Sequence, residues 1–356
     1  MTAITNKAEF QSLAAQLVAQ PAGIDPHIAP APRRPVKLIV QIPCFNEEAT
    51  LPATLADVPR SIPGIDIIET LVISDGSRDR TVEVARECGV DHIVDLPINK
   101  GLAHAFMAGL DRALSEGADI IVNTDADNQY RASDIAKLVV PILTRDAEFV
   151  VGDRPIPTIA HFSRRKRALQ HLGSWVVRVA SGTKVGDAPS GFRALSREAA
   201  LRINTFDSYT YTLETIVHAG LSDMRIVSVP IRVNGETRPS RLVRSIPDYV
   251  ARSARSIMRT TLVYKPSRTF MLMSIPLTVL GLLLAGRWLW LFMDGTDRSH
   301  VPSLLAAAGL LLSAVFLWIA SVLGKLLAIN RRLLQDIQYR LRKQDAMLAR
   351  LKDPEG

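Results

Sequence analysis

The sequence predicts an α/β domain built on a doubly wound sheet, followed by helices that cross a membrane. Two observations favour this class. Strand-like apolar segments alternate with helix-like segments from residue 36 onward, and two long apolar runs stand near the C-terminal end. The chain has 356 residues, of which 47% are hydrophobic and 22% are charged, so it can bury a large core and is not a disordered chain.

The expected elements alternate in chain order. Strands are expected at residues 36–42, 67–74, 90–95 and 118–124. Helices are expected over residues 47–58, in a segment whose first turn includes Asp79, and over residues 102–115. In doubly wound sheets ligands bind beyond the carboxyl ends of the strands, where helix N-termini and backbone amides gather. The residues that follow each strand are therefore the candidate site.

Polar residues follow all four strands. They are Asn46 and Glu47 after the first strand, Asp75 after the second, Asn99, Lys100 and Gly101 after the third, and the segment DADNQ (125–129) after the fourth. Each residue taken alone is explained by a helix cap or a turn. Four such sets at one edge of one sheet favour a binding site, because loops on a rigid scaffold commonly carry function.

The segment after the fourth strand predicts a metal site. Strand alternation would put Asp125 and Asp127 on one side of the chain with Gln129 next in step, so that three oxygen donors converge on Mg²⁺ or Mn²⁺. Such a metal commonly also binds substrate phosphates, and the sequence has no GxxxxGK[ST] motif of a nucleoside triphosphatase. A nucleoside diphosphate joined to a leaving group is the expected ligand.

The two apolar runs predict membrane-spanning helices. Residues 270–293 and 301–329 each reach the roughly 20 residues that a bilayer-spanning helix needs. Only Arg287 and Lys325 interrupt them, each toward the C-terminal end of its run, where a long side chain can reach the interface. The alternative is a pair of core helices in a large soluble domain.

Charges flanking the runs predict the orientation. Basic residues precede the first run and follow the second, whereas the connecting loop 294–300 carries little positive charge. The positive-inside rule therefore puts both flanks and the N-terminal domain in the cytoplasm, at the inner membrane. Cys44 and Cys88 have neither disulfide-framework nor zinc-site spacing, which fits a reducing compartment, and no signal peptide is evident.

Six motifs carry a family resemblance. They are IPCFNEE, SDGSRDRT, NKGLAHAFMAG, DADNQ, VVGDR and SGFR. In their order and spacing, residues from about 36 to 265 resemble the family 2 glycosyltransferases with the GT-A (Rossmann-like) fold, and among these the polyprenyl-phosphate branch. The resemblance implies inverting, metal-dependent transfer of a sugar from a UDP- or GDP-sugar to a polyprenyl phosphate of the undecaprenyl or dolichyl type.

The resemblance also implies roles on the donor side. Pro43, Asn46 and Glu47 would line the nucleotide pocket with Asp75 at the base or ribose, and Asp125, Asp127 and Gln129 would hold the metal against the diphosphate. Two departures from the family pattern stand out. Ser74 and Asp75 stand where relatives have two acidic residues, and Tyr130 and Arg131 stand where many relatives have His-Pro.

Arginines are the candidate ligands of the acceptor phosphate. Arg154 follows a strand-like segment and Arg193 ends the word DAPSGFR near Ser190, and the planar guanidinium suits bidentate contact with phosphate. By resemblance, Arg167 also meets the lipid phosphate. Glu214 stands where relatives have an acid near the acceptor pocket, and a purely structural role for it is an equal alternative. A phosphate monoester, with a second pKa of about 6, is already largely a dianion and needs no general base.

Five parts are predicted along the chain. They are an N-terminal helix and Pro-rich tether (1–35), the catalytic domain (36–240), amphipathic juxtamembrane helices (241–266), a two-helix transmembrane hairpin (267–330) and a C-terminal cytoplasmic helix (331–356). The net charge of +8 calls for anionic partners. A lipid surface and phosphorylated substrates are the expected partners. Nucleic acid is the runner-up and is not predicted, because no aromatic interleaving or RNA-binding motif accompanies the basic residues.

The sequence also bears on two alternative functions and on the oligomeric state. A processive polysaccharide synthase is disfavoured because QxxRW is absent, and an inactive membrane scaffold is disfavoured because the site residues are intact. A heptad pattern in the C-terminal helix predicts a homo-oligomer, a dimer or tetramer, formed as a coiled coil. Its residues are Leu334, Ile337, Leu341, Gln344, Leu348 and Leu351. The alternative is a single amphipathic helix that folds back on the catalytic domain or lies on the membrane.

Overall fold

The computed structural model describes residues 34–155, 178, 182–204, 211–234, 266–295 and 301–352. The predicted N-terminal helix and most of its tether, Arg167, and the predicted juxtamembrane helices up to residue 265 lie outside these residues. Their placement therefore stays a prediction.

A single mixed sheet organises the described part of the domain. Its strands are β1 (Lys37–Cys44), β2 (Ile67–Asp75), β3 (His92–Leu96), β4 (Ile120–Asn123), β5 (Phe149–Asp153), β6 (Arg193–Ser196) and β7 (Ile226–Pro230), in the order β3-β2-β1-β4-β6-β5-β7. The four strands predicted from the apolar runs are confirmed and pair in parallel. β6 runs antiparallel to both β4 and β5, which the sequence analysis does not predict.

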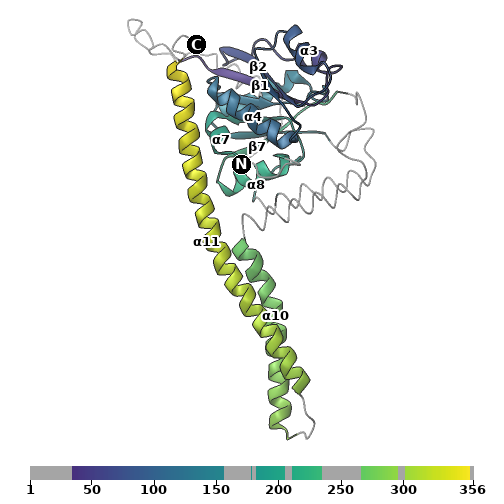
Figure 1. Ribbon diagram of the computed structural model, residues 1–356, viewed down its shortest axis with the longest axis vertical. Coiled ribbons are helices and arrows are strands. Elements are labelled where there is room, and N and C mark those ends of the chain that lie inside the picture. The colour runs from purple at the N-terminus through teal and green to yellow at the C-terminus, as the bar shows by residue number, and fades with distance from the viewer. Residues whose placement is uncertain are drawn as a thin grey trace, which may run out of the picture. The chain divides into compact units, whose positions relative to one another are not determined.

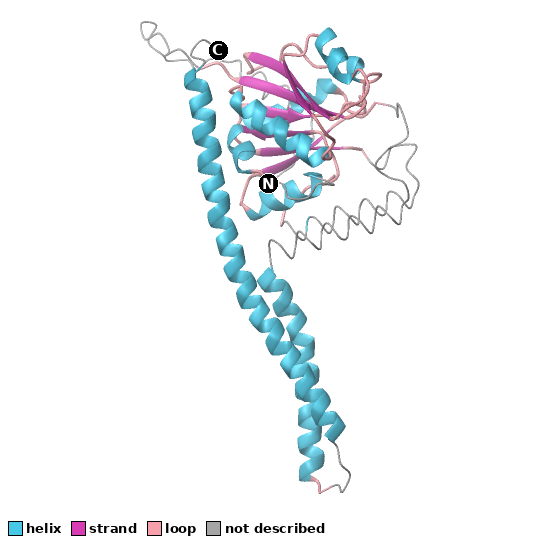
Figure 2. Cartoon of the chain, viewed as in Figure 1, coloured by secondary structure: helices cyan, strands magenta, loops and turns pink. Residues whose placement is uncertain are grey.

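Helices cover both faces of the sheet (Figure 2). They are α2 (Leu51–Ala56), α3 (Thr81–Glu87), α4 (Leu102–Ser115), a 3₁₀ turn η1 (Ala132–Asp134) that leads into α5 (Ile135–Leu143), α7 (Arg197–Arg202) and α8 (Tyr211–Leu221). The prediction for α4 is confirmed at both ends. The first predicted helix is shorter than expected and begins at Leu51, and Asp79 lies before α3 instead of in its first turn. There its carboxylate accepts a hydrogen bond from Thr81 N at 3.0 Å.

The strand residues explain why the sheet is buried on both sides. Along β1, Leu38 and Val40 pack into one layer of core side chains while Ile39 packs into the other, where it meets Phe106 of α4. All four side chains are fully buried. Strands of a parallel sheet covered on both faces read as continuous apolar runs, which is why these strands were visible in the sequence.

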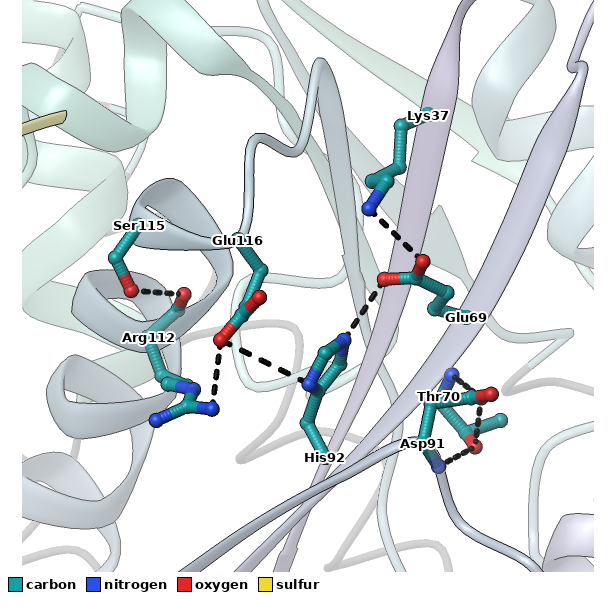
Figure 3. Close-up of polar contacts among 8 residues, drawn as sticks. All are labelled: Lys37, Glu69, Thr70, Asp91, His92, Arg112, Ser115 and Glu116. Carbon is teal, nitrogen blue, oxygen red and sulfur yellow. Dashed lines mark hydrogen bonds and ion pairs between the residues drawn. The ribbon is translucent and has the colours of Figure 1, made fainter. Parts of the chain in front are cut away.

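A polar network fastens the amino ends of the parallel strands (Figure 3). Glu69 of β2 pairs with Lys37 of β1 at 2.8 Å and with His92 of β3 at 2.8 Å. Glu116, which pairs with Arg112 at 2.6 Å, lies on the other side of the His92 ring at 3.8 Å. This network is at the end of the sheet opposite the polar loops, so it stabilises strand register without entering the candidate site.

Two further helices follow the domain, α10 (Pro266–Met293) and α11 (Val301–Lys352) (Figure 1). Each is long and apolar enough to cross a membrane, with mean hydropathies of 2.0 and 2.3 in their most apolar windows. Only 11% and 17% of those windows is buried, whereas the core helix of a soluble protein is mostly buried. The two helices pack closely, since a Cβ on Gly281 would lie 2.9 Å from the Leu311 side chain.

The part of α11 that follows its apolar segment docks on the catalytic domain. Tyr339 donates a hydrogen bond to Glu198 of α7 at 2.8 Å, and Arg342 donates to the carbonyl of Ile203 at 2.8 Å. Arg342 also pairs with Asp111 of α4 at 3.2 Å. One face of the C-terminal helix is therefore bound to its own domain, and the helix is continuous with the second apolar segment.

His218 of α8 provides a test of this docking. The side chain is buried and lies 3.2 Å, between Nε2 atoms, from Gln335 of α11. Burial, with a contribution from Arg331, lowers the pKa of His218 from 6.5 to about 4. Between pH 6.5 and pH 4 the His218 side chain is protonated in the unfolded chain but neutral in the folded chain. The contribution of neutral His218 to the free energy of unfolding is therefore fully present above pH 6.5 and is lost as the pH falls toward 4.

By pH 5 we expect this loss to reach roughly 2 kcal/mol. Melting of the detergent-solubilised protein at pH 7 and pH 5 measures it, with His218→Gln as the comparison. The wild type should lose more stability than the variant on acidification. Parallel losses would mean that His218 does not titrate in this way.

Candidate active site

The loops after β1 and β2 are bonded to each other. Asn46 adopts a left-handed conformation (φ 56°), its N–H donates to Ser77 Oγ at 3.1 Å, and its Oδ1 accepts from Arg78 N at 2.8 Å. Glu47 N donates to Thr81 Oγ1 at 2.8 Å. Pro43, at the end of β1, and Glu47 are both buried. The predicted nucleotide-pocket residues therefore lie on one rigid rim at the carboxyl edge of the sheet.

Asp75 binds the loop that follows β3. Its two carboxylate oxygens accept the N–H groups of Lys100 and Gly101, each at 2.9 Å, and the side chain is buried. Gly76 (φ 67°) lets the loops approach, since a Cβ there would lie 2.5 Å from Asn99 N. The structure thus gives Asp75 a loop-positioning function, while its predicted contact with the base or ribose stays a prediction. Asn99 and Lys100 are exposed on the same edge.

The DADNQ segment forms a turn and not a strand end. β4 stops at Asn123, Asn128 has a φ of 53°, and Gln129 N donates to Asp127 Oδ1 at 3.2 Å. Strand alternation therefore does not explain how the three oxygen donors are placed, because the chain is not extended here. The turn itself keeps Asp125 and Asp127 close enough for their charges to interact.

Asp125 is the electrostatically strained member of the pair. Burial, and then repulsion by Asp127, raise the pKa of the Asp125 carboxyl to about 7, against the opposing charges of Arg154 and Arg193. Near neutral pH this carboxylate therefore lacks part of the positive charge that would stabilise it. A hard divalent cation supplies such charge and prefers oxygen ligands, so the donor set fits Mg²⁺ or Mn²⁺.

The turn alone is not a complete metal cage. In the described ranges, no group of three or more His, Cys, Asp or Glu side chains is placed to hold a metal ion. A cation between Asp125 and Asp127 would complete its coordination with other oxygens, including those of a substrate diphosphate and water. This incomplete ligand set is the arrangement expected of a cation that arrives with its substrate.

Arg154 is held by a buried acid that the sequence analysis missed. Its Nε and Nη2 donate to the two carboxylate oxygens of Asp187 at 2.5 and 3.0 Å. Asp187 is fully buried, and Arg154, directly after β5, is mostly buried. The only sequence signal for Asp187 was its position at the start of DAPSGFR, three residues before Ser190.

Arg193 is a buried residue that holds the same region together. The side chain is fully buried and donates to the carbonyls of Ser190, Ala188 and Thr212 and to the hydroxyl of Thr215, at 2.5 to 2.8 Å. Burial lowers the pKa of Arg193 to about 10, which leaves it charged at neutral pH. These contacts favour a positioning role for Arg193 over direct contact with an acceptor phosphate.

Tyr130 joins the acidic turn to the loop before β6. Its hydroxyl accepts the N–H of Gly191 at 3.1 Å and hydrogen bonds to Asp125, which lowers the pKa of that carboxyl. The Tyr130 ring stacks on Phe192 with centroids 5.1 Å apart. A Cβ on Gly191 would lie 2.8 Å from Asp125 Oδ1, so the turn and the loop are in direct contact. The residue that departs from the family pattern is therefore part of the site.

Asn123, the last residue of β4, links this contact to the neighbouring elements. It accepts a hydrogen bond from Gln41 Nε2 at 2.9 Å and donates to the Gly191 carbonyl and to the Tyr211 hydroxyl, both at 2.9 Å. Tyr211 begins α8, and Glu214 lies buried in the first turn of that helix. Whether Glu214 meets an acceptor stays a prediction.

Comparisons with known proteins identify the family. Residues 39–203 match Glycosyl transferase family 2. An uncharacterized glycosyltransferase of Mycobacterium tuberculosis is 31% identical over 211 residues, which are 58% of this chain and 90% of the relative. The chain belongs to glycosyl transferase family 2.

The names of two relatives of this glycosyltransferase contain a polyprenyl lipid and a phosphate. Polyprenol monophosphomannose synthase of Mycolicibacterium smegmatis is 29% identical over 224 residues, covering 60% of this chain and 82% of the relative. Undecaprenyl-phosphate mannosyltransferase of Micrococcus luteus is 26% identical over 219 residues, covering 58% and 88%.

A solved structure supports the fold of the glycosyltransferase. Glucosyl-3-phosphoglycerate synthase from Mycobacterium tuberculosis, in complex with phosphoglyceric acid, superposes with a TM-score of 0.50 at 21% sequence identity. The match covers 64% of this chain and 79% of that one. It confirms the predicted GT-A fold, in which the mixed sheet places the acidic turn at its carboxyl edge.

Removing the Tyr130 hydroxyl tests its role in the glycosyltransferase. Tyr130→Phe takes one hydrogen bond from Asp125 and one acceptor from Gly191, and we expect a loss of about tenfold in sugar-transfer activity, since a hydrogen bond to a charged group contributes about 1.5–3 kcal/mol. Binding of the donor nucleotide with Mn²⁺ should weaken in parallel.

Tyr339→Phe is the matched control for this prediction, because it also removes one tyrosine hydroxyl, there bonded to Glu198 on α7. It should leave transfer unchanged. Equal activity of both variants would show that Tyr130 does not position the acidic turn.

Proposed function

We propose that this family 2 glycosyltransferase moves a hexose from a UDP- or GDP-sugar to a polyprenyl phosphate, with inversion at the anomeric carbon. The observation that carries the proposal is that the acidic turn packs through Asp125 against Gly191 of the loop before β6, where the Asp125 carboxylate also interacts with the charge of Arg154. The acidic turn, which we assign to the donor, and Arg154, which we assign to the acceptor, thus belong to the same site. The names of two relatives support a lipid phosphate as the acceptor.

The donor side is served by the rigid rim and the acidic turn. The loops after β1, β2 and β3 are bonded to one another through Asn46, Asp75 and their partners, so they present fixed surfaces for a nucleoside. A bound Mg²⁺ or Mn²⁺ would neutralise charge developing on the departing diphosphate. Asp125 and Asp127 would hold that cation, and Tyr130 would fix the orientation of the Asp125 carboxylate through its hydrogen bond.

The acceptor side is served by Arg154. Asp187 engages Nε and Nη2 of this guanidinium, and we assign Nη1 to an oxygen of the acceptor phosphate. Asp187 therefore orients the arginine and keeps its charge in place. Because the phosphate is already largely a dianion, the residues need only hold it in line behind the anomeric carbon, without a general base.

The two apolar helices would place this chemistry at a membrane. We propose that α10 and α11 span the inner membrane, with the catalytic domain on the cytoplasmic side, because basic residues flank the pair and the short connection carries little positive charge. A polyprenyl phosphate lies in the same membrane with its phosphate at the surface. The acceptor and the enzyme are thereby confined to one plane.

A donor screen tests the proposal. The purified full-length protein is incubated with undecaprenyl phosphate, Mn²⁺ and, in turn, UDP-, GDP- and dTDP-hexoses carrying a labelled sugar. We expect label in the organic phase with at least one donor, one sugar for each lipid. Long water-soluble polymer would instead indicate a processive synthase, and no transfer with any donor would favour an inactive scaffold.

A further inference from the structure

The cytoplasmic part of α11 has two different faces. The inner face carries Tyr339 and Arg342, which bind the catalytic domain, and Ala346, which is buried. The outer face carries a stripe of exposed apolar side chains, which we name the outer stripe. Its members are Leu334 (66% exposed), Ile337 (53%), Leu341 (55%) and Leu348 (56%). Docking on the domain therefore leaves the heptad residues uncovered.

Lipid does not cover the outer stripe if α11 spans the membrane. A bilayer core about 30 Å thick takes about 20 helical residues at 1.5 Å each, and the apolar segment of α11 supplies these before Arg331 and Arg332. The helix continues to Lys352 without a break and is held against α4 and α7 by Arg342 and Tyr339. The outer stripe thus lies beyond the hydrocarbon core.

We propose that the outer stripe binds the outer stripe of a second copy of this chain, as a short parallel coiled coil. Leu334, Leu341 and Leu348 recur every seven residues, and Ile337 and Gln344 stand between them at the spacing of the second core position. A polar residue such as Gln344 at one core position is the kind of side chain that sets register in coiled coils.

Charge complementarity supports a second copy as the occupant. If Leu341 and Ile337 are core positions, Arg340 and Asp345 flank the core on opposite sides, five residues apart. Arg340 pairs through Nε with Asp336 of its own helix at 3.0 Å. In a parallel pair the spacing also brings this arginine near Asp345 of the other helix, and the same approach occurs again by symmetry. The helix is therefore complementary to itself in the parallel arrangement.

Membrane confinement supports the parallel arrangement. Leu334 to Leu348 is only two heptads, which is short for a coiled coil free in solution. Copies anchored through α10 and α11 share one plane and one orientation, so their outer stripes meet at a high effective concentration. The inner faces stay bound to their own domains, and two active sites are held over the same leaflet.

Disulfide cross-linking in native membranes tests the contact. Leu341→Cys is made with Cys88→Ser, because Cys88 is exposed while Cys44 is buried. Core positions of a parallel pair face each other, so oxidation should give a dimer of this chain. Lys343→Cys, an exposed position outside the outer stripe, is the matched control and should cross-link at least tenfold less.

Charge reversal tests the partner. Arg340→Glu should weaken dimerisation about tenfold in light-scattering measurements in detergent, and Arg340→Glu with Asp345→Arg should restore it. Leu341→Glu should give monomers that retain transfer activity, because the outer stripe does not touch the site. Three results would overturn the proposal: a monomeric wild type, equal cross-linking at both cysteine positions, or cross-linking of Leu341→Cys to a different protein. None of them would bear on the proposed reaction.

Discussion

Asp127→Asn is expected to lower sugar transfer by about a thousandfold or more, because it removes a charged oxygen ligand at the acidic turn without changing side-chain volume. Metal-dependent binding of the donor nucleotide should be lost with it. Asp125→Asn should have the same effect to a lesser degree, since that carboxylate is already partly protonated near pH 7.

The fold should survive Asp127→Asn, because Asp127 is on a half-buried turn and not in the core. Asp57→Asn, an exposed aspartate at the end of α2, is the matched control and should transfer sugar at the wild-type rate. Circular dichroism checks that all three proteins are folded. Full transfer activity in Asp127→Asn would exclude the proposed metal site.

Arg154→Ala is expected to impair the use of polyprenyl phosphate by about ten- to a hundredfold while donor binding changes little. A charge-assisted contact to a buried phosphate contributes about 1.5–3 kcal/mol. The measured quantities are kcat/KM for the acceptor and the Kd for the donor nucleotide. Equal losses on the donor and acceptor sides would contradict this division between the two groups.

Arg154→Ala also removes the ion-pair partner of the buried Asp187, which can destabilise the protein by itself. A second variant, Arg154→Leu with Asp187→Asn, removes both charges of the ion pair. If Arg154 contacts the phosphate, this double variant should fold as the wild type does and still fail to use the acceptor. Recovery of activity in the double variant would mean that only the ion pair mattered.

The sequence predicted the parts of the fold that depend on the local pattern of apolar and polar residues. The strands β1 to β4 are buried on both faces and therefore appear as apolar runs, and the helix α4 has a clear period and was placed at both ends. The polar segments that follow the strands lie at one edge of the sheet because parallel strands end on the same side.

The parts that the sequence did not predict depend on distant partners. The antiparallel β6 is placed by pairing with β4 and β5, and nothing in RALS alone indicates that direction. Arg193 looked like a phosphate ligand, but its donors are taken by Ala188, Thr212 and other groups that meet it only in the folded chain.

The acidic turn shows how a correct grouping can rest on a wrong reason. Strand alternation does not apply to Asp125 and Asp127, since β4 ends before them, yet the turn still holds their charges together. Tyr130 appeared only as a departure from the family pattern, and its hydrogen bond to Asp125 required the fold. The C-terminal helix docks one face on its own domain, which was the alternative to the coiled coil. The coiled coil stays a proposal that rests on the exposed side chains of the outer stripe.

The central claim is that the acceptor is a lipid phosphate, and one comparison of acceptors tests it most directly. The full-length enzyme, with its preferred sugar donor and Mn²⁺, is offered undecaprenyl phosphate, undecaprenol or glycerol 3-phosphate, and the products are identified by mass spectrometry. We expect a single hexose on undecaprenyl phosphate and none on undecaprenol, because Arg154 binds the phosphate, and at most a trace on the water-soluble phosphate. Transfer to undecaprenol at a comparable rate, or a preference for glycerol 3-phosphate, would contradict the proposed function.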